Sequence, residues 1–470
     1  MLRRSPLLDA FGLAALLAAS GGAARAQTPA PASPPAITVP YERFTLPNGL
    51  DVVLHRDPAT PAISVNTWYH VGSGSERPGR TGFAHLFEHL MFEGSGNVPE
   101  GAIDTWLEEA GGNANGSTSS DRTNYTTEAA SNALELALYL DADRMAHLLD
   151  AMTPAKVDAQ RDVVKNERRQ SYENQPYGLA LPILDQYLYP AEHPYHWPTI
   201  GSMDDLTAAS YDDVTAFFRR YYVPNNATLV VAGDLDVAAA RGLVEKWYGS
   251  IPRGPSSAPL VVPPVRLEAE TRLVHEDRVE LPRLYLAWHT PARYAPGDAE
   301  MDVVAGVLGG GKNSRLYRRL VYDLQIAQDV SAFQSPSGLG STFYVVATAR
   351  PGRPLGELER AIQTEIDGLK AAPPAARELA RVVNRIEADF LDGLESVSGK
   401  ADALNGYLTW TGNPDFFNED LARYRALAPA DVRAAVQSYL RDAGRVVLSV
   451  VPQGQSALAA DRSAPAANKY

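Results

Sequence analysis

The stretch GFAHLFEHLMFEG, residues 82–94, is the part of the sequence from which the fold can first be inferred. Its pattern is helical through residues 83–92, so we predict a helix there. His85 and His89 are four residues apart, which puts them on one face of that helix and one turn apart. Glu88 lies beside them. Two imidazoles in this arrangement can reach a single metal ion.

The order His-x-x-Glu-His is the reverse of His-Glu-x-x-His. Both orders bring a carboxylate close enough to a bound metal to take a proton from its water. We therefore interpret His85 and His89 as metal ligands and Glu88 as the general base. A surface helix that holds two histidines and a glutamate by chance is the alternative. A catalytic zinc usually takes three protein ligands, so a third must come from elsewhere in the chain.

The composition is that of a globular protein without thiol chemistry. Hydrophobic residues make up 45% and charged residues 21% of the 470 residues, close to average usage, and the length predicts about two to three domains. The formal net charge of -13 argues against a nucleic-acid partner. Because the chain has no cysteine, disulfides, thiol catalysis and Cys-ligated zinc are excluded, and any metal must be held by His, Asp or Glu.

Residues 1–26 have the order of a secretory signal peptide. Basic residues precede an Ala/Leu-rich stretch, and Ala24-Arg25-Ala26 then offers small residues for cleavage after Ala26. We expect a secreted, periplasmic protein with no membrane anchor after cleavage. A disordered Ala-rich leader is the alternative, since Asp9 weakens the apolar region. Residues 27–40 are rich in proline and are typical of an extended linker.

Two similar α+β domains follow, each expected to be a mainly antiparallel sheet with helices packed on one face. Asn48-Gly49 predicts a hairpin over residues 44–54, and a Pro- and Ser-rich stretch at 252–264 separates the domains. We predict a catalytic domain at 41–252, a linker at 253–268, a second domain at 269–452 and a disordered tail at 453–470. Strands are predicted at 62–71, 115–126, 226–232, 273–289 and 342–349, and helices at 132–149, after Pro154, at 303–308, 315–324 and within 355–407.

Several segments together resemble the pitrilysin-like zinc metallopeptidases, the family of insulin-degrading enzyme and mitochondrial processing peptidase, and the likeness spans residues 44–451. The segments are residues 82–94, Asn115-Gly116-Ser117-Thr118 with Asp121, Thr123 and Tyr125, Arg161-x-Val163-Val164-x-x-Glu167, Tyr222-x-Pro224-Asn225-Asn226-Ala227-Thr228-Leu229 with Gly233-Asp234, and Ser314-Arg315-Leu316-Tyr317. In that family a glutamate downstream of the second histidine is the third ligand. The resemblance carries this role to Glu167, which composition and spacing do not distinguish from the other acidic residues.

The resemblance implies a zinc-dependent endopeptidase that hydrolyses peptides or unfolded segments and is built as half of a clamshell. One Zn²⁺ per chain would be held by His85, His89 and Glu167, with Glu88 as general base for a metal-activated water. Residues 115–125 would form an edge strand to which substrate pairs, with Asn115, Ser117, Thr118 and Ser119 as substrate-binding residues. A noncatalytic scaffold subunit is the alternative function.

The resemblance also predicts a partner. Active full-length members carry an Arg and a Tyr in their second half, and the matching positions here are Val321 and Gln328, which lack the required donors. We expect a heterodimer in which a second family chain supplies the Arg and Tyr. A homodimer remains open, as does a different alignment in which Arg315 and Tyr322 restore the pair.

Overall fold

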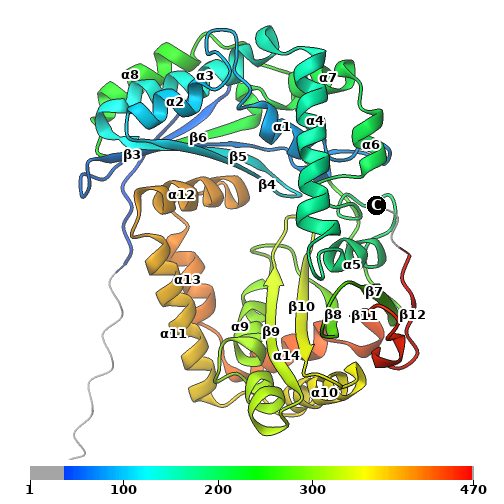
Figure 1. Cartoon of the computed structure of the whole chain (residues 1–470). Helices are drawn as coiled ribbons and strands as arrows, with labels where there is room; N and C mark the ends of the chain where they lie inside the picture. Colours follow the sequence, from blue (N-terminus) through cyan, green and yellow to red (C-terminus); the bar gives the residue numbers. More distant parts are fainter. Residues whose placement is uncertain (1–35, 468–470) are drawn as a thin grey trace, which may run out of the picture. The chain divides into compact units, whose positions relative to one another are not determined.

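The computed structural model describes residues 36–467, and residues from Thr38 onward form one compact unit that contains two six-stranded sheets (Figure 1). The predicted signal peptide and most of the predicted linker lie outside the described residues. We call residues 38–252 the N-terminal half and residues 253–467 the C-terminal half. Among residues 36–467, no helix has the length and apolar character needed to cross a membrane.

The N-terminal half carries the first sheet. Its strands are β1 Glu42–Thr45, β2 Asp51–Arg56, β3 Ala62–Tyr69, β4 Asn113–Thr118, β5 Thr123–Ala130 and β6 Ala227–Gly233. Its helices are α1 Phe83–Leu90, α2 Ala102–Glu109, α3 Leu134–Ala151, α4 Pro154–Arg168, α5 Ala180–Leu188, α6 Met203–Ala208, α7 Tyr211–Tyr221 and α8 Val237–Tyr248, with a π-helical turn, η3 Arg169–Glu173, after α4. The predicted hairpin at Asn48-Gly49 is present, because Gly49 has a φ of 93° that suits the turn.

The C-terminal half carries the second sheet. Its strands are β7 Thr271–Asp277, β8 Arg283–Thr290, β9 Ala327–Ser335, β10 Ser341–Ala349, β11 Arg445–Pro452 and β12 Ala464–Pro465. Its helices are α9 Asp298–Gly309, α10 Leu355–Ala371, α11 Ala376–Gly393, α12 Val397–Thr411, α13 Phe417–Arg425 and α14 Pro429–Tyr439, and η5 Tyr317–Asp323 is π-helical.

Five strands of each sheet follow the same order, and the edge strand beside them differs. The first runs β1-β2-β6-β3-β5-β4 and the second β12-β7-β11-β8-β10-β9. In each, one inner pair is parallel (β2 with β6, β7 with β11) and the next three pairs are antiparallel. The edge strand β1 is antiparallel to β2, whereas β12 is parallel to β7. The predicted fold class, two similar α+β units with mainly antiparallel sheets, is confirmed.

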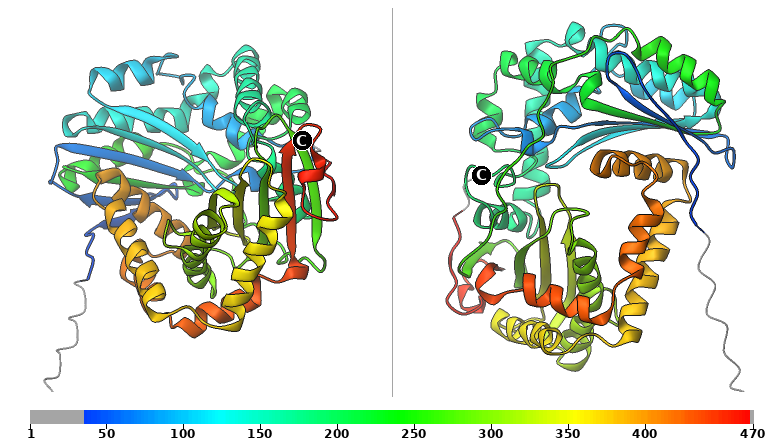
Figure 2. Two further views of the ribbon diagram at one scale, coloured as in Figure 1. Left: turned by 60° about the horizontal axis from the view of Figure 1, so that its bottom comes forward. Right: turned by 180° about the vertical axis from the view of Figure 1, so that it is seen from behind.

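Each sheet has helices of its own half on one face and one helix of the other half on the opposite face. In the N-terminal half α1, α3 and α8 contact one face of the sheet, while α12 from the C-terminal half packs on β3 and β6 (Figures 1 and 2). Asn405 of α12 donates to the carbonyl of Asn66 at 2.9 Å and accepts from Thr228. In return, α5 packs on β8 and β11. The prediction of helices on one face therefore omitted this exchange, which joins residues far apart in sequence.

Three sequence predictions are corrected by the structure. The single strand expected at 273–289 is the two strands β7 and β8, which are separated by residues 278–282. The single strand expected at 115–126 is a hairpin, with β4 and β5 on either side of a turn at residues 119–122. The tail expected to be disordered from residue 453 is ordered through residue 467. There β12 pairs in parallel with β7, Ala460 is buried, and its N–H donates to Ser449 at 3.0 Å. Small side chains let this segment lie against the sheet, where Leu458, Ala459 and Ala460 pack on the core and backbone hydrogen bonds pair β12 with β7. Residues 468–470 lie outside the described part.

Candidate metal centre

Helix α1 is held at both its start and its buried face. Gly82 precedes it with a φ of 90°, and a Cβ there would come within 2.9 Å of the carbonyl oxygen of Ile200. Glu76 accepts the N–H groups of Gly82 and Ala84 at 2.9 and 2.8 Å, which caps the helix N-terminus, and burial raises the pKa of Glu76 to about 8. Leu86, Phe87 and Leu90 are fully buried in the core. His85, Glu88 and His89 are therefore presented on the remaining face.

Helix α4 brings Glu167 to this face. Thr153 caps its start by accepting the N–H of Lys156, and Pro154 occupies its first turn, as the sequence predicts. Val157 and Val164 bury one side of α4 against the core. Beside Glu167, the buried Arg168 donates to the carbonyl of Gly201. These contacts fix the position of α4, which packs against α1.

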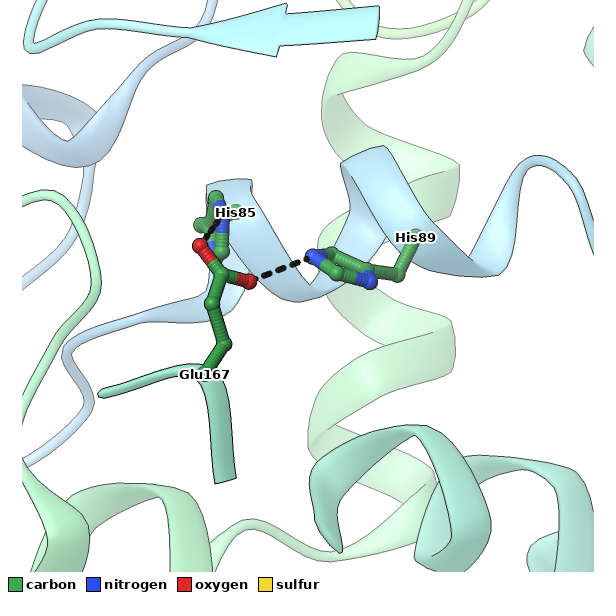
Figure 3. A group of neighbouring side chains, drawn as sticks. All are labelled: His85, His89 and Glu167. Carbon is green, nitrogen blue, oxygen red and sulfur yellow. Dashed lines mark ion pairs between the residues drawn. The ribbon is translucent and has the colours of Figure 1, made fainter. Parts of the chain in front are cut away.

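The three predicted ligands converge (Figure 3). Glu167 Oε2 lies 3.2 Å from His89 Nε2, and Glu167 Oε1 lies 3.7 Å from His85 Nε2. One donor atom from each residue lies within 4.8 Å of the others, and no second group of this kind occurs in the part of the chain that the structure describes. The side chains of His85 and His89 are 12% and 23% exposed, so the group is accessible from one side.

The donor set fits zinc. Two imidazole nitrogens and one carboxylate are a common catalytic zinc set, and ligands about 2.1 Å from a tetrahedral ion lie about 3.4 Å from each other. The distances of 3.2 and 3.7 Å, each to a different oxygen of Glu167, lie close to that value. Burial, with a contribution from His89, lowers the pKa of His85 to about 4. His85 is therefore neutral at physiological pH and has a lone pair to offer.

The side chain of Glu88 lies between its own helix, α1, and strand β4. Thr118 donates to Glu88 Oε2 at 2.6 Å, and burial raises the pKa of Glu88 above its ordinary value. Gly116 passes directly over the side chain, because a Cβ at that position would lie 2.9 Å from Glu88 Cγ. Glu88, the general-base candidate, is thus held in place by contacts with β4, the edge strand of the sheet.

The predicted substrate-binding residues divide into different environments. Thr118 contacts Glu88, whereas Ser117 donates to Asn124 at 2.5 Å and accepts from Arg122 at 2.6 Å. Asn115 accepts the N–H of Gly116, and Ser119 belongs to the turn, where its side chain accepts the N–H groups of residues 121 and 122. The prediction that residues 115–125 form an edge strand is wrong beyond Thr118, because β5 lies inside the sheet between β3 and β4.

Sequence reasoning missed Glu76 and Gly116. Glu76 had a signal, since α1 begins after a glycine that offers no capping side chain and needs an acceptor from elsewhere. In the sequence Gly116 is only one residue of the run 115–118, and its close approach to Glu88 comes from the packing of β4 on α1. Arg315 and Tyr322, the Arg and Tyr pair of the alternative alignment, are not among the residues that converge as candidate metal ligands. Arg315 donates to both carboxylate oxygens of Glu378, and Tyr322 is 54% exposed beside Tyr317.

Comparison with known proteins shows which family the chain is similar to. Residues 51–188 match the family "Insulinase (Peptidase family M16)", and residues 208–386 match "Peptidase M16 inactive domain". The chain is 32% identical over 375 residues to the zinc protease PqqE of Helicobacter pylori, covering 78% of this chain and 83% of that protein.

Solved structures show the same fold. A protease from Helicobacter pylori superimposes with a TM-score of 0.82 at 28% identity, covering 88% of this chain and all of that one. The periplasmic protease PqqL of Escherichia coli, at 17% identity and a TM-score of 0.75, is matched over 90% of this chain but only 49% of its own length. The chain therefore belongs to peptidase family M16, the pitrilysin-like group that its motifs resemble.

Proposed function

We propose that the chain is a zinc-dependent endopeptidase whose catalytic domain spans residues 41–252. The observation that carries the proposal is the convergence of His85, His89 and Glu167 on one point, with Glu88 beside them. Its relatives include proteins named zinc proteases. His85, His89 and Glu167 would hold one Zn²⁺.

The roles of the residues follow from their positions. When bound, zinc supplies a Lewis acid that polarises a peptide carbonyl and acidifies a water molecule. Glu88 accepts the proton of the attacking water and returns it to the leaving amine. Thr118 holds Glu88 Oε2 with its hydroxyl, which leaves Oε1 to exchange the proton. Glu76 contributes indirectly by anchoring the start of α1.

Strand β4 offers a way to bind substrate. It is the edge strand of its sheet and lies against Glu88, so a peptide that pairs with its free edge would run past the general base. Asn115, Ser117, Thr118 and Ser119 are the proposed substrate-binding residues. Such pairing requires an extended chain, so the substrates are peptides or unfolded segments. Rapid digestion of a compact native protein under nondenaturing conditions would contradict this part.

Four variants test the metal and base assignments. Glu88→Gln should retain zinc and lose cleavage by about a hundred- to ten-thousand-fold, because an amide cannot accept the proton. His85→Ala, His89→Ala and Glu167→Ala should each lose zinc. Metal content by inductively coupled plasma mass spectrometry and cleavage of a quenched peptide are measured on the same preparations. Zinc retained at parental affinity in Glu167→Ala would refute the ligand set, and a parent that binds no zinc would favour the noncatalytic scaffold.

A second subunit is part of the proposal. The chain matches about half the length of PqqL. At the positions expected to supply Arg and Tyr it has Val321, which is buried, and Gln328, which is exposed. A second family chain would supply both donors in a heterodimer, and a homodimer is the other arrangement. Donors aimed at the developing oxyanion are commonly worth about 3 to 4 kcal/mol. High activity of the isolated monomer, unchanged by Arg315→Ala and Tyr322→Phe, would contradict this arrangement.

We place the protein outside the cytoplasm. Residues 1–26 have the order of a signal peptide, and the solved relative PqqL is described as periplasmic. Mass spectrometry of the protein recovered from the periplasmic fraction should show Gln27 as the first residue. A protein that retains residues 1–26 and stays with the cytoplasm would refute the assignment.

A further inference from the structure

A polar groove follows the face of β4 that is turned away from α1. It has a volume of about 440 Å³ and is lined by side chains of β3, β4 and β5 and by the residues at the start of α12. The lining consists of four asparagines, three serines, one threonine, two glycines and two carboxylates. No apolar side chain, lysine or arginine is among these lining residues. The groove therefore offers hydrogen bonds and negative charge but no hydrophobic surface.

The alternation of side chains along β4 relates the groove to the candidate metal centre, because one face of the strand borders each of them. Successive side chains of a strand point to opposite faces. The positions of Gly116 and Thr118 face Glu88, whereas Asn113, Asn115 and Ser117 line the groove. Gly116 also borders the groove, so Glu88 and the groove lie on the two sides of one short strand segment.

The two carboxylates of the groove, Glu128 and Asp402, form no ion pair with any residue between 36 and 467. Asp402 accepts only a hydrogen bond from Asn66 at 3.3 Å. Of the neighbouring cations, Lys400 pairs with Asp57, whereas Arg122 donates to the neutral side chains of Ser117 and Asn124, which do not neutralise its charge. The start of α12 is likewise capped, since Ser396 accepts the N–H of Gly399. Arg122 interacts electrostatically with Asp402, so Glu128 is the carboxylate of the groove that is most available to a cation from outside.

A peptide added at the free edge of β4 would send every second side chain toward the groove face. Glu128 lies on β5, one strand inward, so its backbone is about 10 Å from the added strand. A lysine or arginine side chain can span most of that distance, and the Glu128 side chain covers the remainder. An apolar side chain would find no apolar partner, and an acidic one would meet like charge.

We infer that this groove is a subsite of the peptidase that selects substrates with basic side chains at the groove-facing positions. The inference rests on the proposed function, since it takes the peptide to bind along β4. Glu128 and Asp402 are the specificity-determining residues. Both are exposed, so each should contribute modestly, up to about five-fold in the preference for lysine over glutamate.

The test uses one quenched parent peptide with lysine, leucine or glutamate placed at successive positions on either side of the cleaved bond. Values of kcat/KM and cleavage sites are measured for the parent, Glu128→Gln, Asp402→Asn and the double variant. Glu419→Gln, which alters an exposed carboxylate on α13, is the matched control. We expect lysine to be preferred at alternate positions only, the preference to fall about two- to five-fold in each single variant, and the control to keep it.

A binding measurement separates this inference from the proposed function. Fluorescein-labelled lysine and glutamate peptides are titrated against the Glu88→Gln protein, with and without the groove substitutions, and followed by anisotropy. Cleavage by the parent protein without a lysine preference that depends on Glu128 or Asp402 would overturn the subsite and leave the peptidase intact. No cleavage by any preparation, together with a binding preference for lysine peptides that the substitutions remove, would refute the proposed peptidase function. It would support the groove as the site that binds basic side chains.

Discussion

Gly116→Ala is expected to damage catalysis without damaging the fold. Gly116 lies in β4 with an ordinary extended backbone, so alanine is compatible with its conformation. The added Cβ, however, would lie 2.9 Å from Glu88 Cγ and 3.4 Å from ring carbons of Phe92 and Tyr125. Carbon atoms in contact prefer about 3.5 to 4.0 Å. Glu88 must therefore move by roughly 0.6 to 1 Å or rotate away from β4.

That displacement sets the expected size of the effect. The hydrogen bond from Thr118 to Glu88 Oε2 is 2.6 Å long, and a shift of Glu88 away from β4 would stretch or break it. A misplacement of about 1 Å in a reacting group can cost about a hundred-fold in rate. We expect kcat to fall about 10- to 100-fold, with zinc content unchanged because none of the three ligands is touched.

The assay combines kcat and KM on a quenched peptide, zinc content, and the melting temperature. Gly242→Ala is the control, since Gly242 lies within α8 with no atom within 4 Å of an added Cβ, and alanine there should stabilise the helix by about 1 kcal/mol. A Gly116→Ala protein with parental kcat would show that β4 does not hold Glu88 in its working position. Loss of zinc or a collapsed melting temperature would show that the glycine serves the fold instead.

Three further predictions follow from other contacts. Thr118→Val keeps the shape of the side chain but removes the donor to Glu88, so kcat/KM should fall about 10- to 100-fold with zinc retained; parental kinetics would show that the hydrogen bond is dispensable. Asp121 accepts hydrogen bonds from the Tyr195 hydroxyl and from the N–H of Gly338, and the second bond ties the β4–β5 turn to the C-terminal half. Asp121→Asn should therefore speed hydrogen exchange of the β4 amides and raise KM, and unchanged exchange would contradict this. Burial raises the pKa of Asp185 from 3.8 to about 7, so the folded chain retains a proton that the unfolded chain releases. The neutral, protonated Asp185 therefore contributes to stability in full below about pH 4, and this contribution is lost as the pH rises through about 7. Asp185→Asn should therefore reduce the fall in melting temperature between about pH 4 and pH 8, and an identical fall would refute the assignment.

The sequence alone determined the features that depend on near neighbours. The four-residue spacing of His85 and His89 places them on one helical face wherever that helix packs, because the periodicity of a helix is local. The Asn48-Gly49 turn and the start of α4 at Pro154 are equally local, since turn and cap preferences arise within a few residues. The general-base candidate Glu88 came from the same short motif.

Only the tertiary structure decided which distant groups meet. Glu167 is one of 56 acidic residues, and resemblance alone had nominated it; its approach to both histidines depends on the packing of α4 against α1. The same holds for Gly116 over Glu88 and for α12 on the sheet of the N-terminal half. The tail also joined its sheet through backbone hydrogen bonds that its composition does not signal. Such contacts bring together segments separated by many residues, and their positions are set by the burial of whole helix and sheet faces, which no short pattern encodes.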